Sequence, residues 1–554
     1  MPRPDLGPSA VEPAGAPVGS VFVPVVPVRV FDSRPSQGGA GSLTRGETRT
    51  FSVADQTART GGARNVVPTG AVAVAYNVTV PSPGVAGHLR VMPGDVASSS
   101  ASAINFRVGE TIANGLVGKV DAQRRLRVYN AATGAVDAVV DVVGYFVPAA
   151  SGPAGGRFTP ITQTRVYDSA SSREGLLASG GTRKVSVADQ VPADGGAKNI
   201  VPAGVGAVAY NITVVGPGTA GHLRVFPGDQ VSSSASTVNW TVPGDVVANG
   251  LQVRVAADRT IKVFNSAGSP VRFQIDVAGY YAGSGALFFP VDPARAYDSR
   301  AAAPAKGQLG VGAGQVPRTV SVADGRDAAG AVTARDVVPA GAVAIAYNGT
   351  ATATGAGGGL RVFPAGAPAA VPAAIAWPGA GYTRANGHTV GVSADRRVSL
   401  FNTSTKGVDA IVDTLGYYAP EADTTAPPTP GGLRATAGDK TAALSWTAVA
   451  AADLKNYAIY QGPSAAGPWV PAAGSPTAGA AVTVTGLVNG TGYWFTVAAR
   501  DKTGNESAKS TPVAVTPKAP ATVPGAPTGL AATGGDKTAS VVFTAPASDG
   551  GAAI

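Results

Sequence analysis

The sequence lacks several residue types on which chemistry and membrane insertion depend. It has no cysteine, only three histidines and two methionines among 554 residues, and only 14% charged residues. The absence of cysteine excludes thiol nucleophiles, cysteine-ligated zinc and iron–sulfur clusters. No apolar run is long enough to span a bilayer, and residues 1–20 have neither the basic start nor the apolar stretch of a secretion signal. We interpret residues 1–20 as a disordered lead-in.

The chain is instead rich in small and β-branched residues and in residues that form turns, with 74 glycines and 44 prolines. Few stretches combine a helical period with good caps, so the composition predicts strands joined by turns and an all-β fold. The net charge of +9 comes from scattered basic residues. Because no run of Lys and Arg is interleaved with aromatic residues, we expect no nucleic-acid partner. A cell-wall polymer or glycan is a compatible partner.

One sequence pattern occurs three times between residues 21 and 419. Its Ala-Asn-Gly tripeptide begins at residues 113, 248 and 385, so the copies are 135 and 137 residues apart. We place the repeats at 21–148, 156–282 and 286–419. A unit of this length can close its own core, so we expect three separate domains in a row. Each is predicted to be a β-sandwich or jelly roll, with a closed barrel as the alternative.

Three sets of polar residues recur in every repeat: the Asp of the opening strand, the Asn of a Tyr-Asn pair, and the Asp before the closing Gly-Tyr. These positions are Asp32, Asp168, Asp298, Asn77, Asn211, Asn348, Asp141, Asp276 and Asp413. One interpretation is a calcium or sugar site present three times. The other is that these side chains tie down turns at strand ends. We favour the second, because no Asp-x-Asp-x-Asp-Gly loop supports calcium. The Asn-Gly pair of each Ala-Asn-Gly is likewise expected in a tight turn.

No residue combination indicates catalysis, a cofactor or a metal. His88 and His222 occupy equivalent positions, but the third repeat has Gly359 there and His388 lies elsewhere. We therefore expect histidines in turns or at strand edges. Metalloprotease, nucleophile-elbow and phosphate-loop motifs do not occur. Four isolated tryptophans are either sugar-stacking platforms or packing residues, and we favour packing. They are Trp240, Trp377, Trp469 and Trp494.

Residues 424–517 resemble a fibronectin type III domain, and a Pro-rich linker precedes it at 420–430. The resemblance rests on a Pro-Pro pair, Trp446, a Tyr-Ala-Ile-Tyr strand at Tyr457, and Leu487 six residues before Tyr493. It implies an immunoglobulin-like sandwich with Trp446, Tyr457 and Leu487 in its core. The Tyr493 hydroxyl would fasten the connection between the fifth and sixth strands. Residues 524–554 restart this pattern, so we expect a partial second fibronectin type III domain.

The three repeats also resemble repeats of large exported actinobacterial proteins, through the opening Phe/Tyr-Asp-Ser, Tyr-Asn-x-Thr, Ala-Asn-Gly and closing Asp-x-x-Gly-Tyr. This resemblance implies an extracellular or cell-surface location. We expect a non-catalytic protein for adhesion, spacing or glycan and cell-wall binding. One alternative is the accessory region of an exported polysaccharide or peptidoglycan hydrolase whose catalytic domain lies outside this chain. Another is a phage tail or fibre component. The missing export signal suggests a fragment or a virion protein.

Overall fold

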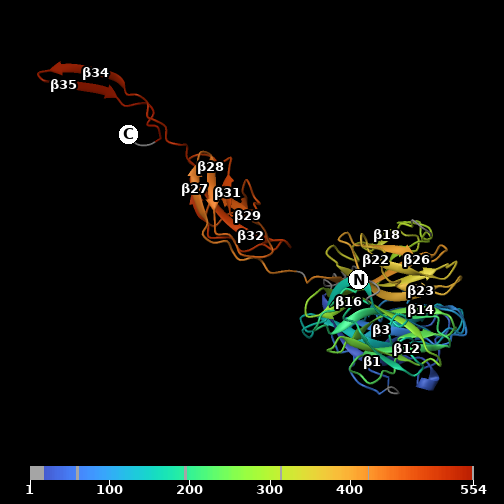
Figure 1. Cartoon of the computed structure of the whole chain (residues 1–554). Helices are drawn as coiled ribbons and strands as arrows, with labels where there is room; N and C mark the ends of the chain where they lie inside the picture. The colour runs from blue at the N-terminus through green and yellow to red at the C-terminus, as the bar shows by residue number, and fades with distance from the viewer. Residues whose placement is uncertain (1–17, 58–60, 192–195, 312–314, 422, 552–554) are drawn as a thin grey trace, which may run out of the picture. The chain divides into compact units, whose positions relative to one another are not determined.

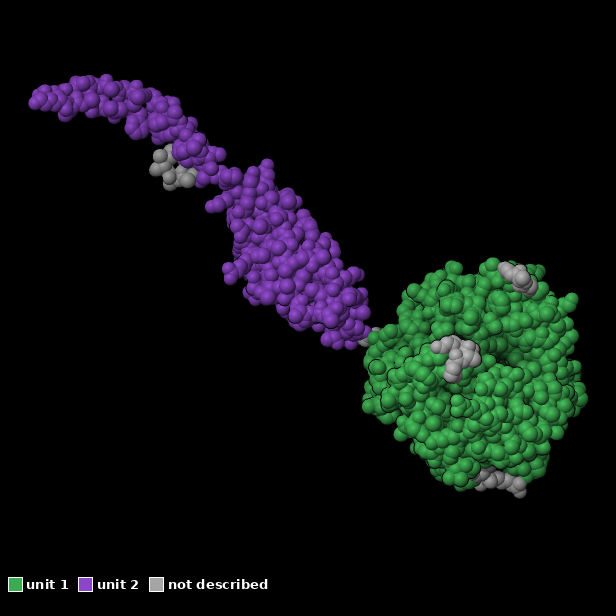
Figure 2. Space-filling view, in the orientation of Figure 1, with its two compact units in different colours: residues 1–421 green, residues 422–554 purple. Residues whose placement is uncertain are grey.

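The computed structural model describes residues 18–57, 61–191, 196–311, 315–421 and 423–551. The chain divides into two compact units, residues 1–421 (unit 1) and 422–554 (unit 2), which Figures 1 and 2 show. Antiparallel sheets dominate both, which confirms the predicted all-β class. Among the described residues there is no α-helix, and none of their helical turns could cross a membrane. Most of the expected lead-in, residues 1–17, lies outside the described part.

Each repeat contributes strands in the same order along the chain. The first repeat contains β1 (Ser20–Asp32), a 3-10 turn η1 (Pro35–Gln37), β2 (Thr48–Ser52), β3 (Ala73–Val80), β4 (Gly87–Pro93), β5 (Ile104–Phe106), β6 (Ile112–Lys119), β7 (Arg125–Asn130) and β8 (Val139–Pro148). The second contains β9 (Arg157–Asp168), β10 (Thr182–Ser186), β11 (Ala207–Val215), β12 (Gly221–Pro227), β13 (Val238–Trp240), β14 (Val246–Arg254), β15 (Thr260–Asn265) and β16 (Arg272–Ala282). The third contains β17 (Leu287–Asp298), β18 (Arg318–Ser321), β19 (Gly325–Arg326), β20 (Val332–Ala334), β21 (Ala344–Thr352), β22 (Gly358–Pro364), β23 (Ile375–Trp377), β24 (Arg384–Gly391), β25 (Arg397–Asn402) and β26 (Asp409–Ala419).

Two four-stranded sheets pack against each other in every repeat. The inner sheets have the orders β6-β3-β8-β1, β14-β11-β16-β9 and β24-β21-β26-β17. The outer sheets have the orders β2-β7-β4-β5, β10-β15-β12-β13 and β18-β25-β22-β23. Strand β3 is buried at every position, whereas β7 alternates buried and half-buried residues. The inner sheet is therefore covered on both faces, and the outer sheet keeps one face accessible to solvent.

The three repeats share a central interior in addition to the cores between their own sheets, which corrects the expectation of three separate domains. The inner sheets of the first and third repeats join through the pairing of Ser20 with Phe288 to form one eight-stranded sheet. One hydrophobic cluster contains buried residues of all three repeats, among them Ala75, Ala209 and Ala346. The physical reason is that the inner strands are apolar on both faces, and a repeat's own outer sheet covers only one of them.

Six aromatic rings, two from each repeat, close one end of this shared interior. They are Phe22, Phe146, Phe158, Tyr281, Phe288 and Tyr418, and all are at most 2% exposed. Phe22 lies 4.6 Å from Tyr281, Phe158 4.4 Å from Tyr418, and Phe288 4.4 Å from Phe146, measured between ring centroids. Each of these contacts joins a different pair of repeats, so the arrangement has pseudo-threefold symmetry about a central axis.

Unit 2 contains a sandwich followed by a hairpin. The sandwich sheets are β27 (Arg434–Gly438), β28 (Thr441–Ser445) and β31 (Ala481–Val484), and β29 (Leu454–Gly462), β30 (Val470–Pro471), β32 (Tyr493–Asp501) and β33 (Val513–Val515). The hairpin is β34 (Thr528–Gly535) and β35 (Thr538–Thr544). Trp446, Tyr457 and Leu487 are buried in the core of the sandwich. The backbone N–H of Val488 donates to the Tyr493 hydroxyl at 3.1 Å, the geometry of a tyrosine corner.

Candidate functional site

The Ala-Asn-Gly tripeptides lie within strands β6, β14 and β24, so their expected location in tight turns is wrong. These three strands surround the pseudo-threefold axis. Gly115, Gly250 and Gly387 are needed because their backbones nearly touch. An added Cβ would lie 2.1 Å from the Gly250 oxygen at Gly115, 2.2 Å from the Gly387 oxygen at Gly250, and 1.8 Å from the Gly115 oxygen at Gly387. Glycine is required here because a side chain would prevent the close approach of the strands, and not because the backbone has a positive φ.

The asparagines of these tripeptides form a closed ring of hydrogen bonds around the axis. Asn249 Oδ1 accepts the Gly115 N–H, Asn386 Oδ1 accepts the Gly250 N–H, and Asn114 Oδ1 accepts the Gly387 N–H. These N···O distances are 2.6, 2.7 and 2.7 Å. Every bond runs from one repeat to the next, and all three asparagines are buried. The ring therefore exists only when all three repeats are assembled.

The Tyr-Asn residues support the same ring from the neighbouring strands. Asn77, Asn211 and Asn348 lie within β3, β11 and β21 rather than at strand ends, which corrects the turn interpretation for them. Their Oδ1 atoms accept the amides of Asn249, Asn386 and Asn114 at 2.9, 3.0 and 3.0 Å, again from another repeat. A strand interior suits these polar groups because each has a partner.

The aspartates before each Gly-Tyr also lie inside strands and form ion pairs. Asp141, Asp276 and Asp413 are at most 1% exposed, so the turn interpretation is wrong for them as well. Their Oδ1 atoms accept hydrogen bonds from Nε of Arg29, Arg165 and Arg295 at 3.0, 2.8 and 2.9 Å. Burial raises the pKa of Asp141 and Asp413, and the adjacent guanidinium group opposes that shift.

The aspartates of the opening strands lie at strand ends. Asp32, Asp168 and Asp298 each accept a backbone N–H two residues further on, at 3.2, 2.9 and 3.0 Å. This is the geometry of a side chain that holds a turn. Burial alone would raise the pKa of Asp32, but the hydrogen bonds and charge of Arg34 outweigh it and lower the pKa. The acids that recur in all three repeats therefore have arginine or backbone partners.

A small cavity of about 10 Å³ lies on the axis between the three repeats. Its lining includes Tyr347 and His388, where His388 takes the place of Leu116 and Leu251 in the other repeats. Within the described part of the chain, the Tyr347 hydroxyl and His388 Nε2 form no hydrogen bond. Burial lowers the pKa of His388 to about 4. The expectation of a histidine at a turn or strand edge is wrong for His388, which lies buried in β24.

Beyond the asparagine ring, toward the starts of β6 and β14, four charged or aromatic side chains meet at the axis. Arg384 is 2% exposed and contacts the carboxylates of Glu110 and Asp245, the latter at 3.2 Å. Its guanidinium group also lies 4.8 Å from the centre of the Tyr382 ring. Burial raises the pKa of Asp245, and the charge of Arg384 opposes that shift. These acids had no signal in the sequence, because the third repeat has Tyr382 in their place.

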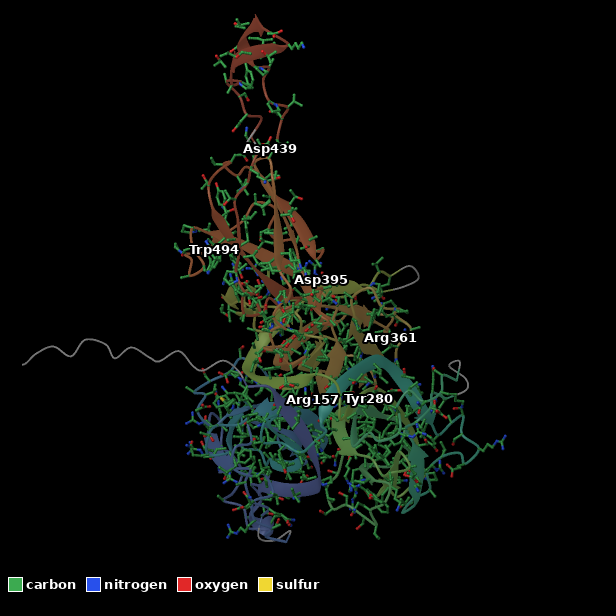
Figure 3. All side chains as sticks on the ribbon, turned by 90° about the vertical axis from the view of Figure 1, so that its left-hand side faces the viewer. Arg157, Tyr280, Arg361, Asp395, Asp439 and Trp494 are labelled. Carbon is green, nitrogen blue, oxygen red and sulfur yellow. The ribbon has the colours of Figure 1, made fainter. Side chains whose placement is uncertain are left out.

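The outer sheets carry an arginine–aromatic pair in every repeat, which sequence analysis missed. The guanidinium groups of Arg90, Arg224 and Arg361 lie 5.3, 5.2 and 5.6 Å from ring centres on the neighbouring strand. The rings are those of Tyr129, Phe264 and Phe401. All six side chains are half-buried, and Figure 3 labels Arg361. The available signal was the recurrence in all three repeats of Leu-Arg-Val and of an aromatic residue that precedes Asn.

Each of these arginines is held in place by backbone and leaves donors available. Their Nη1 atoms donate to the carbonyl oxygens of Ser99, Ser233 and Ala369 at 3.0, 3.2 and 2.9 Å. His88 and His222 each accept the Nε–H of the arginine two residues away, at 3.4 and 3.1 Å. Among the described contacts, the Nη2 atoms of Arg90, Arg224 and Arg361 have no hydrogen-bond partner. An oriented guanidinium beside an aromatic face, with free N–H groups, suits oxygen-rich ligands.

The tryptophans do not form such faces in unit 1. Trp240 and Trp377 are buried, and their indole N–H groups donate to the carbonyl oxygens of Thr219 and Ala356, both at 2.7 Å.

In unit 2 the carboxylates of Asp423, Asp453 and Asp501 offer oxygen atoms within 4.8 Å of one another. Burial would raise the pKa of Asp501, but hydrogen bonds from Asn505 and its neighbours lower it to about 2. The Asp501 carboxylate is therefore used to hold its own loop, through the hydrogen bonds that it accepts from residues 503–505.

Comparison with known proteins identifies one family in this chain. Residues 426–516 match the model of the fibronectin type III domain. These residues form a fibronectin type III domain. The predicted bounds of 424–517 enclose the match. The likeness of the three repeats to exported actinobacterial proteins stays a prediction.

Two curated relatives are polysaccharide-degrading enzymes by name. The chain is 32% identical to exoglucanase B of Cellulomonas fimi over 189 residues, which is 33% of this chain and 16% of that protein. It is 34% identical to chitinase A1 of Niallia circulans over 148 residues, which is 26% of this chain and 19% of that protein. The chain therefore spans less than a fifth of each relative. A fibronectin-like protein from Clostridium thermocellum of known structure matches 17% of this chain and 96% of its own, with 27% identity and a TM-score of 0.15.

Proposed function

We propose that the chain is a non-catalytic, extracellular region that binds polysaccharide, with unit 1 as the binding part and the fibronectin type III domain as a spacer. The observation that carries the proposal is the arginine–aromatic pair on each outer sheet. Sugar rings present apolar C–H faces and many hydroxyl oxygens. An aromatic ring contacts the former, and the N–H groups of a fixed arginine donate to the latter.

The way unit 1 is built supports such a role. Backbone carbonyl groups hold each arginine in one orientation, so little side-chain entropy is lost on binding. The three pairs belong to one compact unit, and their spacing is therefore fixed. Three weak sites at fixed spacing retain a polymer better than one site does, because the second and third contacts form at a high effective concentration.

A second role is favoured by the relatives. Exoglucanase B and chitinase A1 are enzymes, and this chain resembles only a small part of each. We propose that the chain, if it accompanies a hydrolase, is the accessory region that keeps the enzyme on its substrate. If the chain accompanies no enzyme, the same binding would serve attachment to a cell surface or cell wall, or adhesion.

The proposal is tested by sedimenting the full chain with insoluble cellulose, chitin and peptidoglycan and measuring the bound fraction. The test variant is R90Q/R224Q/R361Q. The control is R45Q/R173Q/R335Q, which removes the same charge from one exposed arginine in each repeat. We expect the wild-type chain and the control to bind at least one polymer, and the test variant to bind about tenfold more weakly or worse. The chain should release no soluble sugar from any of them.

Two results would contradict this proposal. One is absence of the wild-type chain from all three pellets. The other is an equal loss of binding in both variants, which would mean that only net charge matters. Thermal unfolding of each variant checks that the loops held by Arg90, Arg224 and Arg361 remain folded. Release of sugar by the chain alone would contradict the non-catalytic assignment.

A further inference from the structure

One pocket of unit 1 is built from all three repeats and lies where the charged axial cluster reaches the surface. We call it the axial-end pocket, and its volume is about 590 Å³. It is lined by Arg107, Val108 and Glu110 of the first repeat, Thr241 and Val242 of the second, and Tyr382 of the third. Its volume falls within the range of small-molecule sites.

The pocket is one place where the pseudo-threefold symmetry is broken. Glu110, Asp245 and Tyr382 are equivalent, since each follows a glycine with positive φ and lies just before the strand that carries a ring asparagine. Arg384 stands where the other repeats have Ile112 and Val247. A symmetric arrangement would bring three acids together. The third repeat instead supplies an arginine and a tyrosine, which produces one asymmetric site.

One cation of the pocket lining, Arg107, has no ion pair among the described residues. Arg384 lies beneath and pairs with both Glu110 and Asp245. The exposed guanidinium of Arg107 stacks on the Tyr382 ring at 4.4 Å. The carboxylates of Glu110 and Asp245 are thus paired with Arg384. The Tyr382 ring orients the Arg107 guanidinium, whose N–H groups remain available to a ligand. A guanidinium held in this way binds carboxylates with two parallel hydrogen bonds.

The remaining lining suits a sugar ring. Val108 and Val242 are 67% and 49% exposed, and both line the pocket. They offer apolar contact for the C–H groups of a pyranose. Thr241 Oγ1 accepts the Thr111 N–H at 2.8 Å, so the Thr241 hydroxyl hydrogen is available to a ligand oxygen. The combination of one cation, one hydroxyl donor and two apolar side chains matches a sugar that carries a carboxylate.

We infer that the axial-end pocket binds one carboxylate-bearing sugar unit of an anionic polysaccharide, with its carboxylate on Arg107 and its ring between Val108 and Val242. This inference rests on the proposed polysaccharide function and assigns a second, charge-selective site to it. The outer-sheet pairs are present three times and do not require a charged sugar. The axial-end pocket occurs once and requires all three repeats.

The test is calorimetric titration of the full chain with glucuronic acid at neutral pH and low salt, with glucose as the neutral comparison and polygalacturonate as the polymer. We expect glucuronic acid to bind more tightly than glucose, and binding to weaken as salt is added. Arg107→Gln should weaken glucuronic acid binding about tenfold or more, because a charge-assisted pair is lost. Val242→Asp should weaken it similarly through repulsion. Arg45→Gln, an exposed arginine of the same repeat, should leave binding unchanged.

The outcomes separate this inference from the proposed function. If R90Q/R224Q/R361Q no longer binds insoluble polysaccharide but still binds glucuronic acid, the two sites are distinct, as inferred. If the chain binds insoluble polysaccharide but neither glucuronic acid nor polygalacturonate, the pocket inference is wrong and the proposed function stands. Binding of polygalacturonate alone would mean that the pocket needs neighbouring sugars of the polymer, provided that Arg107→Gln abolishes it. Equal binding by wild-type and Arg107→Gln proteins would overturn the inference.

Discussion

The side-chain amide of Asn249 donates to the side-chain oxygen of Asn77 at 2.9 Å, although 172 positions separate the two residues. The oxygen of the same Asn249 side chain accepts the N–H of Gly115 at 2.6 Å. One residue of the second repeat thus satisfies two buried polar groups of the first. The equivalent bonds join the third repeat to the second and the first to the third. The stability of unit 1 therefore depends on a buried ring of hydrogen bonds that joins the three repeats.

Replacing Asn249 with alanine should strongly destabilise unit 1. The change leaves the Asn77 oxygen and the Gly115 N–H buried without their present partner, at a cost of about 1–3 kcal/mol each. We expect a loss of about 2–5 kcal/mol in the free energy of unfolding, measured by chemical denaturation. Asn105→Ala is the control, because Asn105 is half-buried and, among the described residues, its side chain has one partner, Ser102. Equal losses in the two variants would argue against a special role for the ring.

Gly387→Ala should destabilise unit 1 for a steric reason. Its Cβ would lie 1.8 Å from the Gly115 oxygen, which belongs to backbone that cannot move aside alone. Overpacking of a rigid core typically costs about 1–3 kcal/mol, and we expect a loss near or above the upper end of that range because the clash is with backbone. Gly283→Ala, where nothing lies within 4 Å of the added Cβ, is the matched control. Differential scanning calorimetry measures both, and an unchanged transition in Gly387→Ala would contradict the close approach of the strands.

The second repeat alone, residues 156–282, should not unfold cooperatively. Its inner sheet would expose a face that the other two repeats cover, including the buried Ala207, Ala209 and Asn211. Buried apolar area is the main source of stability, and loss of a whole sheet face removes too much of it. We expect a broad thermal transition by circular dichroism and binding of a hydrophobic dye. A sharp transition for the isolated repeat would restore the expectation of three independent domains.

The stability of unit 1 should fall as the pH drops from 6.5 toward 4. Burial lowers the pKa of His388 from 6.5 to about 4. The unfolded chain therefore takes up a proton in this range while the folded chain does not. Stability is complete above 6.5 and is lost on acidification, by up to about 3 kcal/mol for this group.

His388→Leu, which copies Leu116 and Leu251, should remove that part of the pH dependence. Denaturant titrations of both proteins between pH 7 and pH 4 measure the difference, in which contributions of other groups such as His222 cancel. We also expect the leucine variant to be more stable at pH 5, since a buried nitrogen without a partner is lost. Parallel stability curves for the two proteins would show that His388 does not titrate as described.

The fold class and the fibronectin type III domain were predictable because their signals are local. Alternation and turn residues predict strands, and the spacing from Trp446 to Tyr493 is typical of one domain family. The repeat pattern also marked Asn77 and Asn114 as special. Its meaning was misjudged, because Asn-Gly in a strand and Asn-Gly in a turn look identical in one sequence. What separates them is the partner, which lies in another repeat.

The assembly of the repeats could not be predicted from length alone. A unit of about 130 residues can bury its own core, so the general expectation favoured separate domains. The contrary signal was the apolar character of both faces of strands such as β3, which one outer sheet cannot cover. The arginine–aromatic pairs were missed for a different reason. Arg90 and Tyr129 lie on strands that become neighbours only through the order of the outer sheet.

The hydrogen bond between Asn114 and Gly387 has a consequence for biosynthesis. The two residues are 273 positions apart, so at about 5–20 residues per second the ribosome needs tens of seconds to deliver the second after the first. During that interval the nascent first repeat displays an uncovered apolar sheet. That surface stays open to aggregation until translation has passed the last of the three glycines.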